Sequence, residues 1–163
     1  MKLLLAIDDS DCSKAAFENV LERSWPLDTE FRVISVIEPV YAQFALGYGY
    51  AEPVYEAQRE YTQHCRQMID EKVERLKKKF AASHITGEVF EGNVTECILS
   101  DACQYSADLL VVGSHGRRGF EKLLLGSVAE HIATHSPCSV EIIKQKQEPA
   151  KKSTDSKKNA ALV

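Results

Sequence analysis

The chain of 163 residues is 44% hydrophobic and 27% charged, which suits one globular domain large enough to bury a core. Its net charge of −4 is unevenly distributed. Residues 144–163 contain six lysines and two acidic residues and so carry +4, and the rest of the chain therefore carries −8. An acidic body argues against general nucleic-acid binding, and no apolar run approaches the ~18 residues that span a bilayer. We therefore expect neither nucleic acid nor a membrane as a partner.

The first half of the chain alternates strand and helix patterns. Residues 2–8, KLLLAID, form a continuous apolar run that predicts a buried parallel strand. This run is too short for a signal peptide, so we expect a cytoplasmic protein whose five scattered cysteines are reduced. Residues 13–25 carry a helical apolar stripe, and 30–37 predict a second strand. Prolines and glycines over 39–53 indicate a long loop, after which helical periodicity runs through 54–82.

The second half continues the alternation. Asn93 and Glu96 have the spacing of an N-terminal cap and its N3 partner, which predicts a helix after Asn93. The remaining predicted elements are strands over 85–92, 107–113 and 138–144 and a helix over 127–134. Strands alternating with helices predict a parallel sheet with helices on both faces, where ligands bind beyond the carboxyl ends of the strands.

A glycine-containing stretch, GSHGRRGFEKLLLGS, follows the fourth predicted strand and so lies at this edge. Gly113, Gly116 and Gly126 follow the spacing G-x₂-G-x₉-G, and Ser127 comes next. This is neither a P-loop nor the G-x-G-x-x-G fingerprint, but a loop without side chains likewise turns backbone N–H groups toward an anion. The alternative is that the glycines only make turns and that Ser127 only caps its helix.

The residues around Ser127 also favour an anion. Ser127 and Glu130 form an S-x-x-E capping box, which predicts a helix start where unsatisfied N–H groups of Gly126 and Ser127 face the ligand. Arg117, together with Arg118 and Lys122, adds positive charge to an otherwise acidic body. The stretch therefore predicts a site for a phosphate chain.

Two segments, LLLAIDDSDCS and ADLLVVGSHGRRGFEKLLLGSVAEHIATHSPCSVEII, resemble the universal stress protein family and its ATP-binding subgroup. The resemblance covers residues 1–145, the expected nucleotide-binding domain, and leaves 146–163 as an expected disordered basic tail. It implies a Rossmann-like α/β fold, an open five-stranded parallel sheet of order 3-2-1-4-5. It also implies a homodimer formed through the fifth strand.

The resemblance also implies roles for individual residues. Asp8 corresponds to a ribose-binding aspartate, and a carboxylate is chemically suited to accept from vicinal hydroxyls. The alternative for Asp8 is to cap the first helix, a task for which Asp9, Ser10 and Asp11 are equally available. Ala6 and Val36 correspond to positions whose backbone contacts adenine. The family's phosphate-binding positions, where Mg²⁺ would be held by the phosphates, correspond to Gly113, His115, Gly116, Arg117, Gly126, Ser127 and Val128.

These observations predict an ATP-binding universal stress protein that acts as a nucleotide-dependent sensor or regulator, with no residue marked as catalytic and no protein-bound metal. One alternative is a slow ATPase or phosphotransferase with Ser114, Ser127 or His115 at the phosphates. Another is a dimeric scaffold that works without nucleotide.

Overall fold

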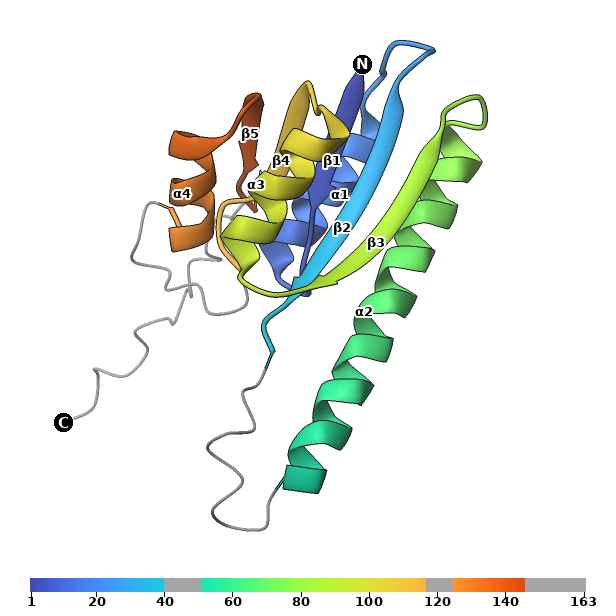
Figure 1. Cartoon of the computed structure of the whole chain (residues 1–163). Helices are drawn as coiled ribbons and strands as arrows, with labels where there is room; N and C mark the ends of the chain where they lie inside the picture. The colour runs from blue at the N-terminus through green and yellow to red at the C-terminus, as the bar shows by residue number, and fades with distance from the viewer. Residues whose placement is uncertain (40–50, 117–124, 146–163) are drawn as a thin grey trace, which may run out of the picture.

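The computed structural model describes residues 1–39, 51–116 and 125–145, and in these residues five parallel strands form one sheet of order β3-β2-β1-β4-β5 (Figure 1). The strands are β1 (Lys2–Ala6), β2 (Glu30–Ile37), β3 (Ile85–Glu91), β4 (Leu109–Gly113) and β5 (Ser139–Ile143). The predicted sheet and its order are therefore confirmed.

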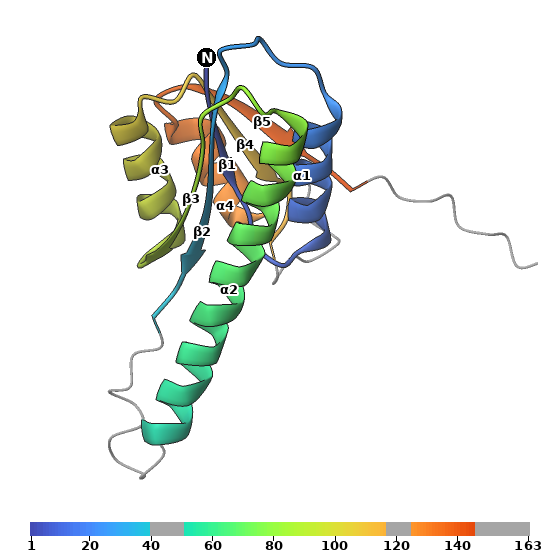
Figure 2. The same ribbon diagram turned by 90° about the vertical axis from the view of Figure 1, so that its right-hand side faces the viewer.

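Four described helices cover the two faces of this sheet (Figure 2). They are α1 (Asp11–Glu22), α2 (Ala51–Lys79), α3 (Val94–Tyr105) and α4 (Ser127–His135). The core cluster under α1 and α2 is separate from the cluster under α3 and α4, as expected for helices on both faces.

The central strand β1 shows why its sequence is a continuous apolar run. Leu3 and Leu5 lie in the cluster under α1 and α2, whereas Leu4 and Ala6 lie in the cluster under α3 and α4. All three leucines are fully buried because β1 has strands on both edges and helices on both faces. This burial fixes the end of β1, and the residues after it, at the carboxyl edge of the sheet.

The helix α2 begins earlier than its sequence indicates. We expected the loop to run to Pro53, but the helix begins at Ala51 and includes this proline. Proline is tolerated there because residues in the first helical turn have no intrahelical acceptor for their N–H groups. The N-terminal part of α2 extends beyond the sheet in both views (Figures 1 and 2). Although α2 has 29 residues, no described helix is long and apolar enough to cross a membrane.

Two smaller features of the helices also bear on the predictions. The Asn93 side chain accepts a hydrogen bond from Glu96 N at 3.2 Å, which confirms the predicted cap of α3. The first helix ends at Glu22, before Trp25, which we had placed on its apolar stripe. Trp25 is held instead by its indole N–H, which donates to Val20 O at 2.8 Å, and by edge-on packing against Phe31.

Candidate functional site

A cavity of about 430 Å³ opens at the carboxyl edge of the sheet, where β1 and β4 lie side by side. This volume is within the range of small-molecule sites. Nine of the ten predicted site residues line it, namely Ala6, Asp8, Val36, Gly113, His115, Gly116, Gly126, Ser127 and Val128. The tenth, Arg117, lies outside the described residues. The nine described residues predicted from the sequence are therefore gathered around one cavity, and their roles there stay a prediction.

One side of the cavity is an apolar slot between the sheet and α3. Its walls are the side chains of Ala6, Ile34 and Val36 from the sheet, Val94 and Ile98 from α3, and Val112 and Ala129. All of these side chains except Val94 belong to the core cluster under α3 and α4, and Val94 packs against that cluster. A slot of this kind favours a flat, weakly polar ring.

The main chain of Val36 supplies polar groups beside this slot. Ile34 O accepts a hydrogen bond from Ile7 N at 2.9 Å, so Ile34 turns its N–H and C=O toward β1. Because these groups alternate sides along a strand, Val36 turns its own to the same side. The strand β1 ends at Ala6, so Val36 faces the cavity there instead of a paired strand. Ala6 itself pairs with strands on both edges, so only its methyl group is left for the cavity.

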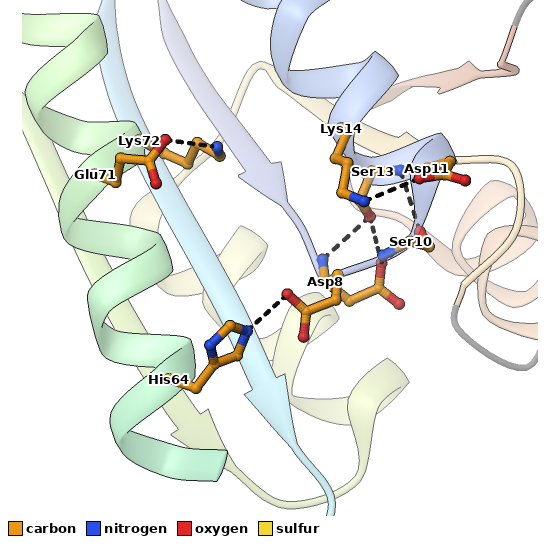
Figure 3. Close-up of polar contacts among 9 residues, drawn as sticks. Asp8, Ser10, Asp11, Ser13, Lys14, His64, Glu71 and Lys72 are labelled. Atoms are coloured by element: carbon orange, nitrogen blue, oxygen red, sulfur yellow. Dashed lines mark hydrogen bonds and ion pairs between the residues drawn. The ribbon is translucent and has the colours of Figure 1, made fainter. Parts of the chain in front are cut away.

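Asp8 follows β1 and is one of the residues that line the cavity. Its Oδ1 accepts hydrogen bonds from Ser10 N at 3.1 Å, Ser10 Oγ at 2.5 Å and Ser13 Oγ at 2.6 Å (Figure 3). The N-cap of α1 is Ser10, whose side chain accepts from Ser13 N. Asp8 is therefore not the cap of α1, and the alternative assigned to it does not hold.

The glycines of the motif have different neighbours. A Cβ on Gly113 would lie 2.8 Å from the backbone of Cys12 and Ser13, so this glycine lets β4 approach the first turn of α1. A Cβ on Gly116 would lie 3.0 Å from Asp8 Oδ2, on the cavity wall. A Cβ on Gly126 would meet the loop backbone at His115 at 3.3 Å. Of these three glycines, Gly116 is the one at which a side chain would meet the cavity wall and not a neighbouring stretch of backbone.

The start of α4 differs from the prediction in two respects. Gly126, not Ser127, is the N-cap and makes no side-chain cap, so the predicted capping box is wrong. Ser127 stands one position too late to cap, because it already has helical geometry. The Gly126 N–H is also not left for a ligand, since it donates to Ser114 O at 2.8 Å.

The N–H groups that remain at the α4 terminus are those of Ser127, Val128 and Ala129. The first intrahelical bond of α4 runs from Glu130 N to Gly126 O, so these three groups lie ahead of it. All three residues line the cavity. A helix N-terminus carries partial positive charge and favours an anion by about 0.3–1 kcal/mol in exposed settings. The anion-binding part of the prediction therefore shifts from Gly126 to the first turn of α4.

Ser114 was a candidate residue at the phosphates, but the structure places it elsewhere. It is buried, and its hydroxyl lies 3.5 Å from Cys12 Sγ and 3.1 Å from His115 Nδ1. It is absent from the described lining of the cavity. Among the residues that the structure describes, no three His, Cys, Asp or Glu residues lie close enough to hold a metal ion.

Ser10 and Ser13 are site residues that our reading of the sequence missed. The signal was present as the spacing D-x-S-x-x-S over residues 8–13, which allows both hydroxyls to reach the aspartate. Ser10 was named only as one of three residues available to cap the first helix, which it does, and Ser13 was given no role. On the opposite side of Asp8, a second cavity of about 310 Å³ lies against α2, where His64 Nε2 contacts Asp9 Oδ1 at 3.0 Å (Figure 3).

This sheet order, with a glycine-containing loop and a ligand-sized cavity at its carboxyl edge, defines a Rossmann-like α/β protein. The sequence pattern of the universal stress protein family matches residues 1–144, and the chain belongs to that family. It is 28% identical to universal stress protein MJ0531 of Methanocaldococcus jannaschii over 144 residues, covering 88% of this chain and 82% of the relative.

Solved structures share the fold. Universal stress protein UspA from Lactobacillus plantarum superposes with a TM-score of 0.75 at 21% identity, covering 88% of this chain and 97% of that one. A universal stress protein family protein from Arabidopsis thaliana, At3g01520 with AMP bound, superposes with a TM-score of 0.62 at 20% identity, covering 90% of this chain and 92% of that one.

Proposed function

We propose that this universal stress protein binds ATP in the cavity at the carboxyl edge of the sheet and acts as a nucleotide-dependent sensor or regulator in the cytoplasm. The observation that carries the proposal is that three kinds of surface line one cavity. Apolar side chains, the Asp8 carboxylate and the N-terminus of α4 suit the base, the sugar and the phosphates of a nucleotide. The AMP bound to the Arabidopsis relative supports the choice of an adenine nucleotide.

Each part of the ligand has a proposed contact. Adenine lies in the apolar slot, with its polar edge at the N–H and C=O of Val36. The ribose hydroxyls donate to Asp8, and the phosphates accept from the first-turn N–H groups of Ser127, Val128 and Ala129. The loop of Gly113, His115 and Gly116 closes over the phosphates, with Arg117 following it in the sequence. Magnesium is bound through phosphate oxygens and water, as is usual for nucleotides.

The described cavity favours binding over catalysis. Phosphoryl transfer needs a group that orients the attacking hydroxyl or water. Ser114 points into the protein, and Ser127 is at the first position of α4. His115 is the remaining candidate for a slow ATPase, with its ring nitrogen 3.1 Å from Ser114 Oγ. Release of labelled phosphate from ATP measures that alternative directly.

The test of binding uses Gly116→Val. The added side chain begins 3.0 Å from Asp8 Oδ2 and fills the cavity between sugar and phosphates, while the φ of Gly116 is not in the left-handed region. We expect calorimetric titration to give ATP binding for the unchanged protein and at least about a tenfold weaker affinity for the variant.

Ala57→Val, on the exposed face of α2, adds a similar branched side chain away from the cavity and should bind ATP like the unchanged protein. A folded Gly116→Val protein that binds ATP with unchanged affinity would place the nucleotide elsewhere. Failure of the unchanged protein to bind ATP, ADP or AMP would favour the nucleotide-independent scaffold.

A further inference from the structure

Ser13 holds both the main chain and the side chain of Asp8. Its hydroxyl donates to Asp8 Oδ1 at 2.6 Å and accepts from Asp8 N at 3.1 Å (Figure 3). The two bonds join residues five positions apart and close a ring between the end of β1 and the first turn of α1. Ser13 is 5% exposed, so little water competes for these bonds.

Ser10 holds the same carboxylate oxygen from a second direction. Its N–H and hydroxyl lie 3.1 and 2.5 Å from Asp8 Oδ1, the oxygen to which Ser13 Oγ also donates. The Ser10 hydroxyl also lies 3.1 Å from His115 O in the loop after β4. The other oxygen, Asp8 Oδ2, is the one beside Gly116 on the cavity wall. Asp8 is thus oriented with one oxygen toward α1 and the other toward the glycine loop.

Orientation of this kind affects affinity because binding otherwise has to order the side chain. An aspartate has two side-chain torsions, and fixing them before the ligand arrives lowers the cost of binding. Donors on one carboxylate oxygen also decide which oxygen the ligand meets. Neither effect requires Ser10 or Ser13 to touch the nucleotide.

We propose that Ser13, supported by Ser10, is a positioning residue that turns Asp8 Oδ2 toward the sugar, and that Ser13 affects nucleotide affinity and sugar selectivity only through Asp8. The inference rests on the proposed function and deepens it by naming what sets the selectivity for a ribonucleotide. Ser13 is the better residue to test because Ser10 also caps α1 and its loss weakens the helix.

The first experiment is a double-mutant cycle of Ser13→Ala and Asp8→Ala, with titration by ATP, 2′-deoxy-ATP and 3′-deoxy-ATP. In the unchanged background, Ser13→Ala should weaken ATP about 3- to 10-fold and reduce the preference for ATP over the deoxy analogues. In the Asp8→Ala background it should have no further effect. Ser35→Ala, another buried serine to alanine change, is the control and should leave affinity and selectivity unchanged.

Equal losses in both backgrounds, or no loss in either, would overturn the inference while leaving ATP binding intact. The second experiment needs no ligand, so it holds even if no nucleotide binds. The amide proton of Ser10 donates to Asp8 Oδ1 and reports where that oxygen lies. In the NMR spectrum of the free protein, Ser13→Ala should move this resonance toward its position in Asp8→Ala.

A Ser10 amide resonance that stays in place in Ser13→Ala would show that Ser13 does not orient the carboxylate, and would overturn the inference without reference to any ligand. If Ser13→Ala fails to fold, Ser13→Cys replaces it in both experiments, since a thiol has a similar shape but forms weaker hydrogen bonds.

Discussion

Gly113 and Gly116 lie three residues apart in one motif, yet they have different tasks. Gly113 makes room for α1, and Gly116 makes room at the cavity. A motif of this kind is usually attributed to phosphate contact as a whole. Here its first glycine is explained by the packing of a helix against a strand.

The first residue-scale prediction concerns Gly113→Ala. The new Cβ lies 2.8 Å from backbone atoms of Cys12 and Ser13, which cannot turn away as a side chain does. We expect a loss of about 1–3 kcal/mol in the free energy of unfolding, measured by urea denaturation. Gly116→Ala meets only the Asp8 carboxylate and should lose much less. Equal stability of the two variants would contradict the assignment.

The second concerns Asp8→Ala. If the carboxylate binds ribose, its loss should weaken ATP and AMP roughly 10- to 100-fold, because a hydrogen bond to a charged group is lost. Competition by inorganic pyrophosphate should remain nearly unchanged, since its proposed contacts are at the start of α4. Displacement of a fluorescent nucleotide measures both. Equal weakening of the two competitors would give Asp8 a structural role instead.

Residue-level sequence reasoning found one local contact, missed one tertiary contact and misplaced one helix cap. The Asn93 cap depends on a spacing of three residues and was predicted correctly. The task of Gly113 depends on how closely β4 approaches α1, about a hundred residues away in the sequence, and no pattern around Gly113 contains that distance. Ser127 was predicted to be the N-cap because it begins an S-x-x-E pattern, but the N-cap is the residue before it, Gly126.

At the scale of elements, α1 and α2 are joined on their shared face by Glu18 and Arg75. Arg75 Nη1 and Nη2 donate to the two Glu18 carboxylate oxygens at 2.7 and 2.8 Å. These hydrogen bonds lower the pKa of Glu18 below its ordinary value of 4.5. The pair therefore links the helix after β1 to the long helix on the same side of the sheet.

The lowered pKa predicts a pH dependence with a definite sign. The unfolded chain protonates Glu18 at a higher pH than the folded protein does, so the stabilisation is full above 4.5 and is lost as the pH falls through the lowered pKa. Glu18→Gln should therefore lower stability at pH 7 and have a smaller effect at pH 3. Glu22→Gln in the same helix is the control, and urea denaturation at both pH values is the measurement. A cost of Glu18→Gln that is the same at both pH values would contradict the linkage.

The sequence predicted elements better than their ends. The strands were found because β1, β2 and β4 are largely buried on both faces and therefore consist mostly of apolar residues. The start of α2 was missed because Pro53 was taken to end a loop, although a proline fits equally well in a first helical turn.

At the scale of the whole molecule, β5 is an edge strand with apolar side chains. Its only described strand partner is β4, and Val140, Ile142 and Ile143 are half-buried. Ser114 N donates to Ile143 O at 2.7 Å, so Ile143 turns its backbone groups toward β4. Because the backbone groups of successive strand residues point to opposite sides, the N–H of Ile142 points away from β4. A backbone carbonyl of a second copy of the chain can accept a hydrogen bond from it there.

We therefore predict a homodimer through β5, which a proline at Ile142 should disrupt without breaking a bond to β4. Sedimentation should give a dimer for the unchanged protein at micromolar concentration and a folded monomer for Ile142→Pro. Ile143→Pro is the contrasting variant, because it should strain the β4 pairing and lower the melting temperature. A monomer for the unchanged protein would contradict this proposal.

The position of β1 in the centre of the sheet has a consequence for how the molecule is made. Lys2 N donates to Asp108 Oδ2 across 106 residues, and the cavity combines Asp8 with Ser127. On a ribosome, β1 emerges well before β4 and cannot pair with it until about a hundred further residues have been synthesised. Closing such a long loop is slow, as in other folds with distant contacts. A nucleotide held between Asp8 and α4 would join two segments that are far apart in the sequence, and its binding energy would stabilise the closure of that loop.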